Sequence, residues 1–210
     1  NGTNVPGLLR NADTDLINHL RQFYWTNAIN RYGDNISNQI FIDKTTMNTF
    51  DLGLINCIFP DAKILFLLRD PRDVCISCFM QIMEPTAMTV HLTNWKSTAD
   101  FYHLTMTWWE HIKQIMPAKY LEFRYEDTIS NFEETYTNIF KFLNIEWTEE
   151  ANNFHKHAAK KFIASPSYTQ VTKPLYTTSL ARWKRYESEF SPILDKLQPF
   201  ISKFNYDSPS

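Results

Sequence analysis

The chain has 210 residues, and its shares of hydrophobic (43%) and aromatic (15%) residues are typical of a folded domain rather than a disordered tail. Only four residues are glycine, and no two stand close enough to form a phosphate-cradling loop. This excludes a Walker-type loop and a dinucleotide fingerprint within these residues. The formal net charge is −2, but the stretch 151–186 has no acidic residue and seven Lys or Arg residues. That stretch favours a compact anionic ligand over nucleic acid, and a solvated face beside an acidic neighbour explains it equally well.

The predicted elements alternate between helices and strands along the chain. Apolar residues at helical spacing predict helices over 15–32, 50–59, 94–116 and 192–203. A capping pattern, Ser130-x-x-Glu133, predicts a helix that ends near Leu143, and a further helix is expected to open at 148. Strands are predicted over 39–43, 63–68 and 119–125, the second apolar enough to be covered on both faces, and a long loop over 160–182. This alternation predicts an α/β fold with a central parallel sheet flanked by helices.

The turn after the second predicted strand carries a candidate anion site. Arg69 ends the strand, and Asp70 with Pro71 is typical of a helix start; the helix is expected to run to about residue 83. Asp73 and Ser77 follow Arg69 at four-residue steps, so the three can lie on one side of the turn and helix. A guanidinium and a hydroxyl there would bind a phosphate monoester. An Arg69–Asp73 surface pair beside an ordinary helical serine is the alternative.

Cysteine and histidine residues give no metal site in the sequence. Cys75 and Cys78 form a C-x-x-C pair, but no second pair accompanies it, and the apolar surroundings favour buried thiols. No metal is therefore expected. Three cysteines are too few for a disulfide framework, which favours a cytoplasmic location, although sequons at Asn1 and Asn35 leave the secretory pathway open. The longest apolar run is too short to cross a membrane.

Four segments resemble one family in their residues and in their order. The segment 59–79 (FPDAKILFLLRDPRDVCISCF) resembles the 3′-phosphate-binding segment of sulfotransferases that use 3′-phosphoadenosine 5′-phosphosulfate (PAPS). DKxxxN at 43–48 ahead of LGLI, FRYED at 123–127 and QVxxPxYxxSxxRWxxY over 170–186 are similar to further motifs of that family. Within the family they resemble most the bacterial sulfotransferases found behind tetratricopeptide repeats and the related tyrosylprotein sulfotransferases.

The resemblance implies roles for residues that match these motifs. Arg69 and Ser77 would bind the 3′-phosphate of the donor. Lys44 would neutralise the bridging oxygen as the sulfuryl group departs, because negative charge builds up there in the transition state. From the residues alone, Lys44 is equally well explained as a solvated lysine after an edge strand.

The remaining implied site residues lie toward the C-terminus. Tyr125 would lie near the adenosine, where an aromatic face can stack, and a core tyrosine at a strand end is the competing explanation. Ser179 and Arg182 would close over the donor phosphates from the acid-free stretch. Trp183 is explained equally well as core or as ligand wall.

Two parts of the family pattern are missing from these residues. The Gly-rich loop for the 5′-phosphosulfate is absent, and so is the following segment, where tyrosylprotein-type enzymes carry a glutamate general base. Thr46 stands where the small-molecule branch has a catalytic histidine. The resemblance thus implies a P-loop-NTPase-like sulfotransferase fold over 1–210 as one domain, incomplete at its N-terminus. Its expected segments are a leading helical segment, a sheet core with the 3′-phosphate site, and a C-terminal basic loop with helices: 1–38, 39–145 and 146–210.

The implied activity is transfer of a sulfuryl group from PAPS to a hydroxyl acceptor, with 3′-phosphoadenosine 5′-phosphate (PAP) as the product. The acceptor is a peptide tyrosine, a glycan or a small alcohol, and no nucleic-acid partner is expected. An upstream tetratricopeptide region is a further family-based expectation. Without the phosphosulfate loop, catalysis by this chain alone is not assured. A degenerate, non-catalytic nucleotide-binding or interaction module is one alternative; a nucleotide-dependent kinase is another, although its magnesium-binding residues are not recognisable here.

Overall fold

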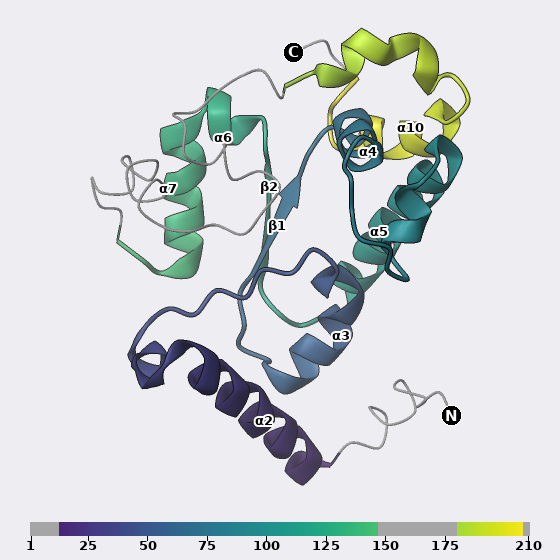
Figure 1. The fold of residues 1–210 in the computed structure, drawn as a ribbon. Coiled ribbons are helices and arrows are strands. Elements are labelled where there is room, and N and C mark those ends of the chain that lie inside the picture. The colour runs from purple at the N-terminus through teal and green to yellow at the C-terminus, as the bar shows by residue number, and fades with distance from the viewer. Residues whose placement is uncertain (1–12, 147–179, 208–210) are drawn as a thin grey trace. The chain divides into compact units, whose positions relative to one another are not determined.

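A computed structural model describes residues 13–146 and 180–207 (Figure 1). The described residues fall into two compact units. The first unit holds the described residues up to Ala62 together with 105–119. The second holds 63–104 and the described residues from Tyr120 onward. Helix α5 (Trp95–Ile115) contributes its first half to the second unit and the rest to the first. This division groups residues by spatial proximity and does not test the expected segments 1–38, 39–145 and 146–210. Those segments stay predictions.

The first unit is helical. It contains α2 (Thr14–Tyr32), the short 3-10 helix η1 (Asp34–Asn38), α3 (Asn48–Ile58) and the second half of α5. Asp13 caps α2 by accepting the N–H of Leu16 at 2.8 Å. Arg21 Nε donates to the carbonyl of Ile58 at 2.8 Å and so ties α2 to the end of α3.

The strand expected over 39–43 is wrong, because these residues adopt no regular structure and belong to no sheet. The ring of Phe41 packs instead against Tyr24 and Trp25 of α2, with ring centroids 6.4 and 5.5 Å apart. Ile40 and Ile42 point outward and are more than half exposed. The alternation of apolar residues that predicted a strand therefore reflects one side chain packed on a helix rather than a sheet.

The second unit contains the two strands that the structure describes. β1 (Ile64–Leu68) and β2 (Tyr120–Arg124) pair in parallel, in the register Ile64 with Tyr120 through Leu68 with Arg124. The prediction that β1 is covered on both faces is wrong, since Leu65 and Leu67 are 37% and 52% exposed.

Two helices follow β2 and pack beside it, α6 (Asp127–Ser130) and α7 (Phe132–Leu143) (Figure 1). The predicted capping box is wrong, because Ser130 ends α6, where its Oγ donates to the carbonyl of Glu126. The helix that the box was meant to open begins after Asn131 instead.

The remaining elements of the second unit are helical. They are α4 (Pro71–Phe79), the 3-10 helix η2 (Thr89–Leu92), the irregular 3-10 segment η4 (Arg182–Phe190) and α10 (Leu194–Lys203). α4 ends four residues earlier than expected, and Ile82 beyond it is 97% exposed, so no buried face extends the helix. α4 packs against η4 and α10, and the buried side chains there include Cys75, Ile76, Leu197 and Ile201.

A mostly helical chain with a small parallel sheet agrees with the expected α/β fold. The helix expected at 148 and most of the loop expected over 160–182 lie outside the described residues. Among the helices that the structure does describe, none is long and apolar enough to cross a membrane.

Candidate functional site

Arg69 and Tyr125 leave neighbouring strands at the same edge of the sheet. The N–H of Tyr125 donates to the carbonyl of Leu68 at 2.8 Å, which extends the pairing of β1 and β2 by one step. The guanidinium carbon of Arg69 lies 4.8 Å from the centroid of the Tyr125 ring. In open parallel sheets, ligands bind beyond the carboxyl ends of the strands. The end of the sheet that carries Arg69 and Tyr125 is therefore where this fold would hold a bound molecule.

Asp73 stands opposite Arg69 on the first turn of α4. Arg69 Nη2 lies 3.7 Å from Asp73 Oδ2, and the Asp73 side chain is only 1% exposed. The pair is therefore not the surface ion pair that the sequence left open. Ser77 follows Asp73 by one helical turn, on the same face of α4, and is half-buried.

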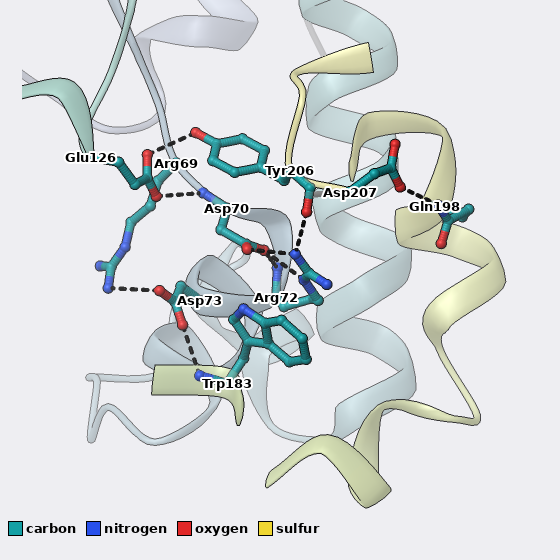
Figure 2. A network of polar contacts seen from close by, with 9 residues as sticks. All are labelled: Arg69, Asp70, Arg72, Asp73, Glu126, Trp183, Gln198, Tyr206 and Asp207. Atoms are coloured by element: carbon teal, nitrogen blue, oxygen red, sulfur yellow. Dashed lines mark hydrogen bonds and ion pairs between the residues drawn. The ribbon is translucent and has the colours of Figure 1, made fainter. Parts of the chain in front are cut away.

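Arg72, the second arginine of the turn, is engaged within the protein (Figure 2). Its Nε and Nη2 donate to Asp70 Oδ1 and Oδ2 at 2.9 and 2.7 Å, and Nη2 also donates to the carbonyl of Tyr206 at 2.8 Å. Its guanidinium carbon lies 3.7 Å from the Trp183 ring centroid. Asp70 thus holds Arg72 in a close pair of hydrogen bonds, whereas Arg69 meets Asp73 at the longer distance of 3.7 Å and is more exposed, which makes Arg69 the better candidate for an external anion.

Glu126 joins the end of β2 to the start of α4 and to the C-terminal segment. Its Oε1 accepts the N–H of Asp70 at 3.1 Å, and its Oε2 accepts the hydroxyl of Tyr206 at 2.8 Å (Figure 2). Burial, with this carboxylate beside it, raises the pKa of the Tyr206 phenol. Sequence reasoning did not single out Glu126 or Tyr206, although Glu126 stands inside the FRYED motif.

The start of η4 lies along α4. The backbone N–H of Trp183 donates to Asp73 Oδ1 at 2.8 Å, and Arg182 Nη2 donates to the sulfur of Met80 at 3.4 Å. A thioether is a weak acceptor and does not neutralise a guanidinium. Arg182 is therefore brought to the helix that carries Ser77, whereas Ser179 lies outside the described residues.

The pKa of the Asp73 carboxyl is raised from its usual value, because burial disfavours the charged form. The Trp183 N–H and the Arg69 guanidinium act in the opposite direction, and burial outweighs both.

Lys44 lies in the first unit, on the irregular segment ahead of α3, and is exposed. Its neighbour Asp43 accepts the hydroxyl of Tyr24 at 2.8 Å and the amide of Asn48 at 3.5 Å. Burial and the Asp43 carboxylate raise the pKa of Tyr24 to about 12. The side chains that hold Asp43 therefore fix the backbone next to Lys44. Tyr24 was missed from the sequence because it stands 19 residues away.

Other features of the described residues do not resemble a donor site. Burial raises the pKa of Cys75 and Cys78 alike, which keeps both thiols protonated. No group of three or more metal-ligating side chains occurs in the ranges that the structure describes. A cavity of about 620 Å³ beside β2 and α7 has three carboxylates in its lining, Glu122, Asp127 and Glu134, against one cation, Lys141, and this balance disfavours a phosphate.

Comparison with known proteins gives a consistent set of similarities. Residues 10–149 match the model of the sulfotransferase family. The chain is 27% identical over 165 residues to an uncharacterized protein of Aquifex aeolicus. It is 24% identical over 169 residues to a protein of Caenorhabditis briggsae that bears the provisional name protein-tyrosine sulfotransferase. It is 26% identical over 164 residues to cytosolic sulfotransferase 14 of Arabidopsis thaliana.

The matched regions take up most of this chain but only part of each relative. They cover 77%, 76% and 72% of this chain, against 21%, 58% and 45% of the Aquifex, Caenorhabditis and Arabidopsis proteins. The chain therefore corresponds to part of the length of these relatives.

Proposed function

The chain belongs to the sulfotransferase family, and on that premise we propose that it takes part in the transfer of a sulfuryl group from PAPS to a hydroxyl acceptor. The observation that carries the proposal is the position of Arg69. Its guanidinium stands at the carboxyl end of a parallel strand, against the Tyr125 ring and at the start of α4. A guanidinium fork at a helix N-terminus is suited to a phosphate monoester.

In this proposal the donor is held through its 3′-phosphate and its base. Arg69 and Ser77 bind the 3′-phosphate, and Tyr125 lies near the adenosine. Arg182, together with Ser179, binds the donor phosphates. The contacts of Arg69 with Tyr125 and of Arg182 with Met80, the residue that follows α4, support this assignment for the described residues.

The reaction is an in-line displacement at sulfur. The acceptor oxygen forms a bond to sulfur while the bond from sulfur to the bridging oxygen of PAPS breaks, and that oxygen leaves with the electron pair as part of PAP. The acceptor proton passes to a general base, a role for which the resemblance places a glutamate ahead of these residues. Lys44 stabilises the charge that develops on the leaving oxygen. This role for Lys44 rests on the resemblance. The exposed position of Lys44 is compatible with it.

The acceptor is a peptide tyrosine, a glycan or a smaller alcohol. Thr46 departs from the histidine of the small-molecule branch, which favours the other two classes. The provisional name of the Caenorhabditis relative supports a tyrosine acceptor, and the name of the Arabidopsis relative does not decide between classes.

Calorimetric titration of the chain with PAP and with 5′-AMP tests the proposal. We expect PAP to bind with a dissociation constant on the order of micromolar and 5′-AMP at least about tenfold more weakly, since only PAP carries the 3′-phosphate. Arg69→Ala should weaken PAP binding by roughly tenfold or more and leave 5′-AMP unchanged. Arg31→Ala, at an exposed arginine on α2 in the first unit, is the matched control and should bind PAP normally.

Three outcomes would contradict the proposal in different ways. Equal affinity for PAP and 5′-AMP would remove the 3′-phosphate site. Binding of nucleoside triphosphate with magnesium, and not of PAP, would favour a kinase. Binding of PAP by a protein that transfers no sulfuryl group to any acceptor class would favour the non-catalytic module.

A further inference from the structure

We infer that Asp73 is a positioning residue whose buried carboxylate holds the chain at Trp183, so that Arg182 contributes to donor binding only while this contact is intact. The inference rests on the proposed function, because it concerns how the proposed donor site is assembled. It assigns Asp73 a role through its neighbours rather than a contact with the donor.

The surroundings of Asp73 favour such a role over simple packing. Asp73 is fully buried in α4, where its neighbours Pro71, Cys75 and Ile76 are buried and far less polar. Burying a carboxylate is unfavourable unless its oxygens find partners, and an apolar side chain would fill the space at less cost. Its Oδ1 accepts the Trp183 N–H, and its Oδ2 faces Arg69 without a hydrogen bond among the described residues.

The contact with Trp183 fixes the backbone at the first residues of η4. Ala181 immediately before η4 has a φ of 49°, a left-handed conformation that is unfavourable for alanine and requires support from its surroundings. Two contacts give that support at Trp183, namely its N–H bonded to Asp73 and its ring beneath the Arg72 guanidinium (Figure 2). The conformation of the backbone on either side of Arg182 therefore depends on Asp73.

The position of Arg182 follows from that anchor. Its guanidinium contacts Met80, the residue that directly follows α4 and stands three residues after Ser77. Arg182 consequently lies within one helical turn of a proposed phosphate ligand, and its positive charge is not matched by the sulfur that it contacts. If η4 were released from Asp73, the Arg72 contact with the Trp183 ring and this weak bond would remain, but the backbone hydrogen bond that fixes the residue next to Arg182 would be lost.

A double-mutant cycle with two isosteric variants tests the inference. Asp73→Asn keeps an oxygen that accepts the Trp183 N–H and removes the charge, whereas Asp73→Leu keeps the shape and removes the acceptor. Arg182→Ala is made in the wild type and in both variants, and PAP affinity is measured by calorimetry. We expect Arg182→Ala to weaken PAP binding roughly tenfold in the wild type and in Asp73→Asn, and less than about twofold in Asp73→Leu.

A merely structural Asp73 would not produce this pattern. A roughly tenfold effect of Arg182→Ala in all three backgrounds would overturn the inference. Asp100→Asn is the matched control, because Asp100 pairs with Lys196 at 3.1 Å on a half-exposed surface of the same unit. It should leave the effect of Arg182→Ala unchanged, and a loss of the effect there would also contradict the inference.

The outcomes separate this inference from the proposed function. A wild type that does not bind PAP overturns both. If PAP binding depends on Arg69 but the effects of Arg182→Ala and Asp73→Leu simply add, the inference alone is overturned. Should Asp73→Leu fail to fold, hydrogen exchange of the Trp183 amide in the wild type decides instead. PAP should slow this exchange about tenfold or more, and an unchanged exchange rate would contradict the coupling between donor binding and the Asp73–Trp183 contact.

Discussion

Arg69 and Arg72 stand three residues apart, yet the protein uses them differently. Arg72 donates to both oxygens of Asp70 and lies on the Trp183 ring, and its side chain and that of Asp70 are 13% and 10% exposed. Arg69 faces Asp73 at a longer distance and keeps 22% of its side chain exposed. The Arg72–Asp70 pair holds the turn together, and Arg69, which contacts Asp73 and the Tyr125 ring, is the more exposed of the two arginines.

Removing the Arg72 side chain should therefore destabilise the protein. Arg72→Ala leaves the nearly buried Asp70 carboxylate without its counter-charge, so we expect the free energy of unfolding to fall by about 3 kcal/mol. Urea unfolding measures this. Arg185→Ala, at an exposed arginine of the same unit, should change stability by less than about 0.5 kcal/mol. A loss for Arg72→Ala no larger than that of the control would show that the Asp70 pair is not a stabilising contact.

Tyr24 gives a prediction on pH at the same scale. Its pKa is raised to about 12 in the folded chain, so between pH 10 and 12 the unfolded chain loses the phenol proton first. The stability that Tyr24 contributes is thus complete below about pH 10 and is lost as the pH rises toward 12. Tyr24→Phe should flatten the fall of unfolding free energy over this range, measured by urea unfolding at several pH values. An equally steep fall would mean that burial and Asp43 do not raise the pKa of this phenol.

At the scale of elements, the three cysteines differ in exposure. Cys75 of α4 is buried, Cys78 of α4 is half-buried, and Cys57 of α3 is exposed. Burial keeps Cys75 and Cys78 protonated, and the thiolate is the reactive form. A thiol reagent should modify Cys57 rapidly, Cys78 slowly and Cys75 only on unfolding. Labelling followed by mass spectrometry checks the order, with Cys57→Ser as the control that loses the rapid phase. Rapid modification of Cys75 would mean that α4 is not packed as described.

The same elements show what the sequence could predict. β1 and α4 were predicted because a local apolar run and the pair Asp70-Pro71 suffice to define them. The segment 39–43 was mistaken for a strand because its alternation is also produced by Phe41 packing on α2. The candidate site was predictable only where motif spacing marks it, as at Arg69. Contacts such as Glu126 with Tyr206, 80 residues apart, depend on tertiary packing and leave no local pattern.

At the scale of the whole molecule, the proposed donor-binding residues that the structure describes belong to the second unit, and Lys44 belongs to the first. The proposal therefore assigns binding and leaving-group stabilisation to side chains on separately packed parts of the chain. Arg69 acts on the donor in its ground state, whereas Lys44 acts on charge that appears as the sulfuryl group departs. Substitutions at the two positions should affect different measured quantities.

Lys44→Ala should slow transfer without weakening donor binding. We expect its turnover to fall by roughly a hundredfold, because a group that stabilises developing charge is lost, and the KM for PAPS, in which that charge has not yet developed, to stay within about twofold. Arg69→Ala should instead affect binding more than turnover, with PAP affinity reduced roughly tenfold. Transfer is measured with the longest natural chain that contains these residues, using radiolabelled PAPS and a panel of a tyrosine peptide, a disaccharide and a simple phenol. Lys119→Ala, at an exposed lysine of the first unit, is the matched control and should retain full turnover. If Lys44→Ala raises the KM for PAPS and leaves turnover unchanged, Lys44 binds the donor uniformly and does not assist its departure.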